Sequence, residues 1–182
     1  MGKVIWAFNN FDFFTNEYYH LFMKLVKFLS FFLPEKSAFA HCDIPCGIYD
    51  THNVLLAAHT IIRMTQLLQV IKQDDDLKAD HAIARYTYVK EEHANLLEKE
   101  LDTLRNDYFK KEHYEEYIKL DDLFKKVLKS LATARQNIDM SAAEETLSEV
   151  LEISEIFYKT KGVEPVRIKS VYPTQREVVL YK

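Results

Sequence analysis

Mostly apolar side chains recur every three or four residues along the chain, which is the spacing of one face of an α-helix. The first stripe comprises Val54, Ala58, Ile61, Thr65 and Leu68, and the second comprises Ile83, Tyr86, Val89, His93, Leu97, Leu101, Leu104 and Tyr108. The third comprises Tyr117, Leu120, Phe124, Val127, Leu131 and Ala134, and the fourth comprises Ala143, Leu147, Val150, Ser154 and Phe157. The pattern predicts four amphipathic helices.

Polar segments mark where these helices begin and end. The segment Tyr49–Thr51 offers a capping side chain to the first helix, and Ser141 with Glu144 three residues later forms a capping box for the fourth. The fourth helix ends near Gly162. Four helices with short connections predict an all-α fold, an antiparallel four-helix bundle that spans residues 51–162.

The two ends of the chain differ from this pattern. The segment from Met23 to Leu33 carries two lysines and a short apolar run and is followed by Ala38-Phe39-Ala40, an arrangement typical of a secretory signal. We therefore predict that residues 1–40 are a removable leader, with Met23 as an alternative start; an ordinary amphipathic helix is the alternative interpretation. Residues 163–182 contain two prolines and a β-prone end, and the sequence assigns them no role.

Composition narrows the class of protein further. Only three Gly and four Pro occur in 182 residues, which argues against a β-rich fold. The net charge is −4, both signs are interspersed and no dense basic run occurs, so nucleic acid is not expected as a partner. A small anionic substrate remains compatible, because local fields matter more than net charge.

The candidate chemistry lies in His41-Cys42-Asp43-Ile44-Pro45-Cys46-Gly47. The only two cysteines are too close in sequence to staple the fold, and thiols beside His and Asp indicate a metal or redox site. Cleavage after Ala40 would give His41 a free amine, which forms fused planar chelate rings with the amide nitrogen and thiolate of Cys42. Planar nitrogen–sulfur donors suit nickel(II) or copper(II) better than zinc. Pro45 and Gly47 favour a turn that brings Cys46 to the same metal.

The ten residues His41–Asp50 match every position of the pattern His-Cys-Asp-x-Pro-Cys-Gly-x-Tyr-Asp. They closely resemble the nickel-hook of nickel superoxide dismutases. The resemblance extends through Lys90–Glu92, Asn106–Lys110 and Phe157–Lys161, and so covers about residues 41–161. It implies a homohexamer of right-handed helical bundles that converts superoxide into oxygen and hydrogen peroxide by Ni(II)/Ni(III) cycling, with one nickel ion per subunit.

The resemblance also implies roles for individual residues. His41 is the ligand through its amine and imidazole, Cys42 through its amide and thiolate, and Cys46 through its thiolate. Tyr49 is expected over the open face of the metal, Tyr108 near it, and Asp43 as the residue that holds the loop.

Two positions depart from the best-known members, which carry a glutamate and an arginine that orient the axial imidazole. These positions fall at Ala57 and His93 here. Either His93 takes over the orienting role, or the His41 geometry differs. Lys90 and Lys110 match lysines that attract an anionic substrate.

Other interpretations stay open at this point. The same chelate suits a nickel or copper storage or delivery protein without turnover, and a secreted helical protein with a Cys42–Cys46 disulfide is a third possibility. His52, His59, His81 and His113 are expected to be solvated or hydrogen-bonded and not ligands. We expect superoxide and a processing peptidase as partners, no stable membrane insertion, and a cytoplasmic location, with export as the alternative because of the signal-like leader.

Overall fold

The structure is a computed structural model, which describes Lys24, residues 47–72 and residues 76–182. His41, Cys42, Asp43 and Cys46 lie outside the described residues. The chain divides into two compact units, Met1–Asp43 and Ile44–Lys182, and the description below concerns the second.

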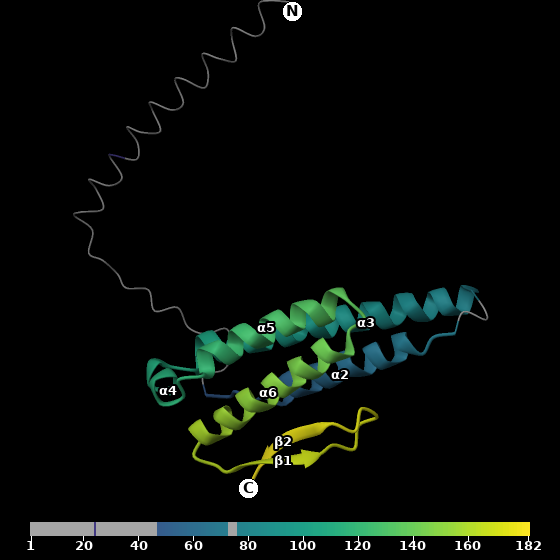
Figure 1. Cartoon of the computed structure of the whole chain (residues 1–182). Helices are drawn as coiled ribbons and strands as arrows, with labels where there is room; N and C mark the ends of the chain where they lie inside the picture. The colour runs from purple at the N-terminus through teal and green to yellow at the C-terminus, as the bar shows by residue number, and fades with distance from the viewer. Residues whose placement is uncertain (1–23, 25–46, 73–75) are drawn as a thin grey trace, which may run out of the picture. The chain divides into compact units, whose positions relative to one another are not determined.

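Four long helices form the second unit, as the hydrophobic pattern predicted. They are α2 (His52–Gln69), α3 (Asp76–Thr103), α5 (Leu120–Gln136) and α6 (Met140–Thr160). Helix α3 packs on α2 and α5, and α6 packs on α5 and α2, so the four helices close a ring around one core (Figure 1). The antiparallel four-helix bundle is confirmed. A short helix, α4 (Lys111–Glu116), occupies the connection before α5, where no helix was expected.

The predicted stripes supply most of this core. The largest fully buried side chains are Phe124, Phe157, Ile61, Ile62, Leu97, Leu101, Leu104, Leu120, Ile153, Val54, Val127 and Val150. The second stripe is buried only in its later half; Ile83, at its beginning, is 37% exposed. Figure 1 shows why: the first turns of α3 extend past the end of α5.

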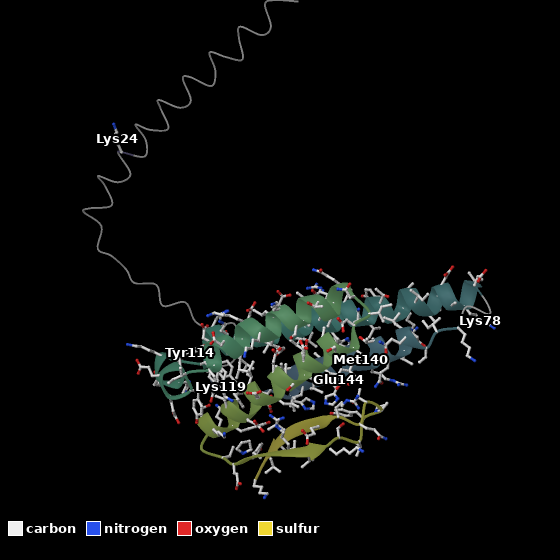
Figure 2. All side chains as sticks on the ribbon, in the orientation of Figure 1. Lys24, Lys78, Tyr114, Lys119, Met140 and Glu144 are labelled. Atoms are coloured by element: carbon white, nitrogen blue, oxygen red, sulfur yellow. The ribbon has the colours of Figure 1, made fainter. Side chains whose placement is uncertain are left out.

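The cap of α6 differs from the prediction. Asp139, not Ser141, is the N-cap residue, and its carboxylate accepts a hydrogen bond of 3.1 Å from the Ala142 amide. Asp139 has extended backbone dihedrals that aim its side chain at the amide three residues later. Glu144, which is labelled in Figure 2, makes no capping box with Ser141 and instead pairs with Arg176 of the C-terminal tail.

The C-terminal tail forms a β-hairpin that packs on the bundle. Strands β1 (Pro165–Lys169) and β2 (Glu177–Tyr181) pair antiparallel, with Arg167 opposite Val179. Val179 is 1% exposed and joins the bundle core, and the Arg167 guanidinium lies 2.6 Å from the Glu155 carboxylate of α6. The tail, to which the sequence assigned no role, is therefore an integral layer over α6 and α2.

A buried histidine joins the hairpin to α2. His59 Nε2 lies 3.0 Å from the Glu177 carbonyl and therefore donates to it, so Nδ1 accepts from the Thr174 hydroxyl 2.7 Å away. Burial lowers the pKa of His59; the hydrogen bond to Glu177 opposes this effect, and the charge of Arg176 adds to it. His59 is thus hydrogen-bonded, as expected, and held neutral.

None of the helices within the described residues is both long enough and apolar enough to cross a membrane.

Candidate metal centre

The described chain resumes directly after the predicted ligands. Gly47 has φ +92°, in the left-handed region that favours glycine, which agrees with the turn predicted there. Tyr49 and Asp50 then lead into α2. The structure therefore shows how the chain leaves the predicted hook, while His41, Cys42, Asp43 and Cys46 remain predictions.

Asp50 provides the capping side chain expected at the start of α2. Its Oδ1 accepts hydrogen bonds from the amides of Thr51, at 2.6 Å, and His52, at 3.0 Å. A carboxylate at this position also interacts favourably with the positive end of the helix dipole. The hydroxyl of Tyr158, on α6, donates to the same oxygen at 3.3 Å. The exit from the hook is thus tied to two helices.

The two tyrosines predicted near the metal contact each other. The rings of Tyr49 and Tyr108 have centroids 5.4 Å apart and an interplanar angle of 53°. Tyr108 ends a π-helical turn, η1 (Leu104–Tyr108), in which the Phe109 amide donates to the Leu104 carbonyl five residues earlier. The sequence predicted an ordinary helix up to Tyr108. The wider turn changes the direction in which Tyr108 leaves the helix, and such turns are frequent at functional sites.

The orientation of Tyr108 is fixed by α6. Its hydroxyl lies 2.6 Å from the Thr160 hydroxyl, which itself donates to the Phe157 carbonyl at 2.7 Å. Since a threonine hydroxyl has one proton, Tyr108 is the donor in the first bond. The Phe157 ring lies 4.7 Å from the Tyr108 ring. Tyr108 is therefore held by both its ring and its hydroxyl.

Two further residues that were not in the predicted site also contact Tyr108. The ring of His113 stacks on it, with centroids 5.7 Å apart, and the Lys161 ammonium lies 4.6 Å from its ring centroid, a cation–π distance. The sequence offered a signal for Lys161, which ends a family-like segment. It offered none for His113, because the contact depends on the fold of the connection after Tyr108.

The two lysines proposed to attract substrate have different surroundings. Lys90 is buried, and its ammonium donates to the carbonyls of Ala134, at 2.9 Å, and Asn137, at 2.6 Å. Burial lowers the pKa of Lys90. Its ammonium caps the end of α5 and is shielded from solvent, which argues against the predicted role in attracting superoxide. Lys110 is exposed, with its ammonium 2.7 Å from the Asp107 carbonyl, and remains a candidate.

The two departures from the family pattern also differ. Ala57 is fully buried on α2 and has no polar side-chain atom. His93 is half-buried and its Nδ1 lies 2.9 Å from the Val89 carbonyl, to which it donates. In the neutral tautomer, Nε2 of His93 is then a hydrogen-bond acceptor.

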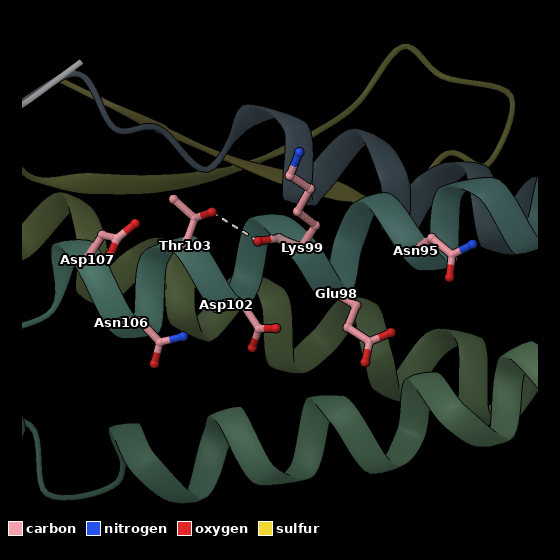
Figure 3. A pocket seen from close by; sticks show the side chains of 7 residues that line it. All are labelled: Asn95, Glu98, Lys99, Asp102, Thr103, Asn106 and Asp107. Carbon is pink, nitrogen blue, oxygen red and sulfur yellow. Dashed lines mark hydrogen bonds between the residues drawn. The ribbon is translucent and has the colours of Figure 1, made fainter. Parts of the chain in front are cut away.

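The acidic residues near the end of α3 do not form an alternative metal site. They border a surface pocket of about 410 Å³ lined by Asn95, Glu98, Lys99, Asp102, Thr103, Asn106 and Asp107 (Figure 3). Within the described part of the chain, no group of three or more His, Cys, Asp or Glu side chains is placed to hold a metal ion. Cys42 and Cys46, the only thiols in the sequence, therefore remain the candidate sulfur donors.

Comparison with known proteins points to one family. Residues 36–161 match the family described as nickel-containing superoxide dismutase. The Superoxide dismutase [Ni] of Streptomyces seoulensis is 34% identical over 130 residues, which cover 71% of this chain and 95% of the relative. That of Streptomyces coelicolor is 32% identical over the same shares.

Solved structures agree with the sequence match. A crystal structure of a nickel-containing superoxide dismutase, in the state after partial X-ray-induced reduction, superposes with a TM-score of 0.60 at 32% identity, over 67% of this chain and 99% of that chain. A native nickel superoxide dismutase structure gives 0.59 at 30% identity, over 66% and 99%.

Proposed function

The chain belongs to the nickel-containing superoxide dismutase family, and from this membership we propose how its own residues serve the reaction. It is a nickel-dependent oxidoreductase that converts superoxide into oxygen and hydrogen peroxide, with one nickel ion per subunit. The observation that carries this function is the family match over residues 36–161, which includes the complete hook pattern of residues 41–50. The storage or delivery alternative is not favoured.

The proposed ligands are the amine and imidazole of His41, the amide and thiolate of Cys42, and the thiolate of Cys46. The donor chemistry fits nickel, because thiolates and a deprotonated amide are electron-rich donors that stabilise its higher oxidation state. The turn at Gly47 is also compatible with a loop that closes on itself. When bound, the nickel ion supplies the one-electron oxidation and reduction of superoxide.

The remaining residues would shield the metal, attract the anionic substrate and hold the hook in place. Tyr49 and Tyr108 form an aromatic contact beside the exit from the hook, and we assign them to limiting access to the metal. The phenolic proton of Tyr108 is engaged by Thr160, so Tyr108 contributes position more than a free proton. Lys161 places positive charge 4.6 Å from the Tyr108 ring centroid, and the exposed Lys110 follows Tyr108 by two residues, so we assign both to attracting an anion. Asp43 is assigned to holding the loop.

His93 is the proposed hydrogen-bond partner that would orient the His41 imidazole. A metal-bound imidazole carries a proton on its remote nitrogen, which needs an acceptor. With Nδ1 donating to Val89, neutral His93 offers Nε2 as such an acceptor, and Ala57 offers nothing. Further parts of the proposal are removal of residues 1–40 by a peptidase, assembly as a homohexamer and a cytoplasmic location, with export as the alternative.

Cysteine variants test the ligand assignment. Cys42→Ser and Cys46→Ser should each abolish nickel retention and dismutase activity while helical circular dichroism is unchanged, because the apolar stripes of the bundle, and not the hook, stabilise the helices. Ile44→Val, a hook position with no assigned ligand, is the matched control and should retain both. A serine variant that keeps one nickel per subunit would refute the assignment.

A further inference from the structure

We propose that Tyr158 is a positioning residue for the nickel-hook and that the C-terminal hairpin, through Tyr181, holds Tyr158 in place. The inference rests on the proposed ligand set, and it gives the hairpin a part in the reaction. Residues 165–181 lie beyond residue 161, where the family match ends, so the hairpin lies outside the matched region, whereas Asp50 and Tyr158 lie within it.

Asp50 is the residue through which Tyr158 would fix the position of the hook. It follows Cys46 by four residues, so chain geometry keeps their Cα atoms within about 14 Å. One oxygen of its carboxylate accepts from two amides at the start of α2 and from the Tyr158 hydroxyl. Asp50 itself is exposed, and Tyr158 supplies the side-chain contact that ties it to α6.

Tyr158 is suited to this task because it is rigid and remains a donor. Its side chain is only 7% exposed and its ring lies 5.3 Å from that of Phe157, at 73°. Burial raises the pKa of its hydroxyl, and the neighbouring Asp50 charge raises this pKa further. The hydroxyl therefore keeps its proton and donates to the carboxylate.

Tyr181 covers the Tyr158 ring from the hairpin side. The two ring centroids are 5.1 Å apart, with an interplanar angle of 42°. Strand β2, which carries Tyr181, is anchored two residues earlier by the buried Val179 and at its start by the hydrogen bond from His59 to the Glu177 carbonyl. The hairpin thus extends a continuous set of contacts from α2, through Tyr181 and Tyr158, to Asp50.

Tyr158→Phe removes the hydroxyl and keeps the ring. In protein purified from its own host, we expect nickel loss to a chelator to accelerate on the order of 10-fold. Amide hydrogen exchange of Thr51 and His52 should also accelerate, with unchanged helical circular dichroism. Tyr88→Phe is the matched control, because it removes another tyrosine–carboxylate hydrogen bond, to Glu92 on the exposed side of α3. The control should behave as wild type.

Tyr181→Ala tests the second link. It should change nickel loss and amide exchange in the same direction as Tyr158→Phe, and the double variant should be no worse than Tyr158→Phe alone, because Tyr181 acts through that hydroxyl. Additive effects, or wild-type nickel loss and exchange in Tyr158→Phe, would overturn the proposal. Amide exchange does not require bound nickel. A wild-type protein that lacks nickel would therefore refute the ligand assignment, while the exchange rates would still test the contacts from Tyr181 through Tyr158 to Asp50.

Discussion

Tyr108 obtains its surroundings from residues that are distant in the sequence. Tyr49 precedes α2, His113 lies in α4, and Thr160 and Lys161 end α6, yet all four contact this one side chain. The Tyr108 side chain therefore contacts three segments that are separate in the sequence. The family pattern identified the two tyrosines, whereas the contacts that orient them required the fold.

The proposal that the His41 imidazole would hold the nickel ion has a spectroscopic test. His41→Gln leaves the amine, the amide and both thiolates, so nickel should stay bound while turnover falls severely. Electron paramagnetic resonance of oxidised wild type should show a rhombic low-spin nickel(III) signal with nitrogen hyperfine structure, and the variant should lose it. His81→Gln, at an exposed position on α3, is the control. Dismutation at the wild-type rate by His41→Gln would contradict the ligand role proposed for the imidazole.

Lys90 should contribute to stability and not to catalysis. Lys90→Met removes the donor to the carbonyls of Ala134 and Asn137, and we expect the free energy of unfolding to fall by about 2 kcal/mol. Denaturant titration measures this loss. Lys99→Met, at an exposed lysine on the same helix, should change stability by less than about 0.5 kcal/mol. Unchanged stability with reduced turnover in Lys90→Met would instead restore the substrate-attracting role.

At the scale of the element, the sequence predicted the helices, which follow from a repeated pattern of apolar residues. It missed the N-cap of α6 and the π-helical turn, which depend on local backbone conformation. The helices followed from periodic apolar residues such as Ile61 and Leu97, which are fully buried. The N-cap of α6 did not, because Asp139 and Ser141 both have capping side chains and only the backbone at Asp139 decides between them. The π-turn before Tyr108 leaves the apolar spacing almost unchanged, so periodicity does not reveal it.

The hairpin was harder to predict for a different reason. Its end was recognisably β-prone, but a two-stranded sheet needs a surface to pack on, and that surface is formed by α6 and α2 after the bundle folds. The ion pair between Arg167 and Glu155 and the buried His59 belong to this docking. Arg167 and Glu155 are distant in the sequence, as are His59 and Glu177, so no local sequence pattern indicates these contacts.

The docking of the hairpin should depend on pH through His59. Its pKa is lowered from 6.5 in the folded protein, so the unfolded chain binds more protons in the window just below 6.5. The contribution of His59 to the free energy of unfolding is therefore greatest above that pH and falls as the pH decreases through the window. Thermal unfolding between pH 7.5 and 5 should show this decrease. The His59→Gln variant should lose that part of the pH dependence, and His81→Gln should keep it; an identical pH dependence in His59→Gln would contradict the assignment.

At the scale of the whole molecule, the bundle and the hook have separate physical origins. The bundle is stabilised by a shared core around Phe124 and Phe157, and this core contains no ligand candidate. The proposed hook rests on the donor chemistry of the motif in residues 41–50, and the structure shows Asp50 hydrogen-bonded where α2 begins. This separation explains why a sequence motif identified the chemistry while periodicity identified the scaffold.

The central claim is that nickel binds to a hook whose first residue is His41 with a free amine. Native mass spectrometry of the protein purified from its own host tests it most directly. We predict that each nickel-loaded subunit begins at His41, lacks the mass of residues 1–40 and carries one nickel ion. A nickel-loaded subunit that still carries residues before His41 would contradict the claim, because the amine donor would then be an amide.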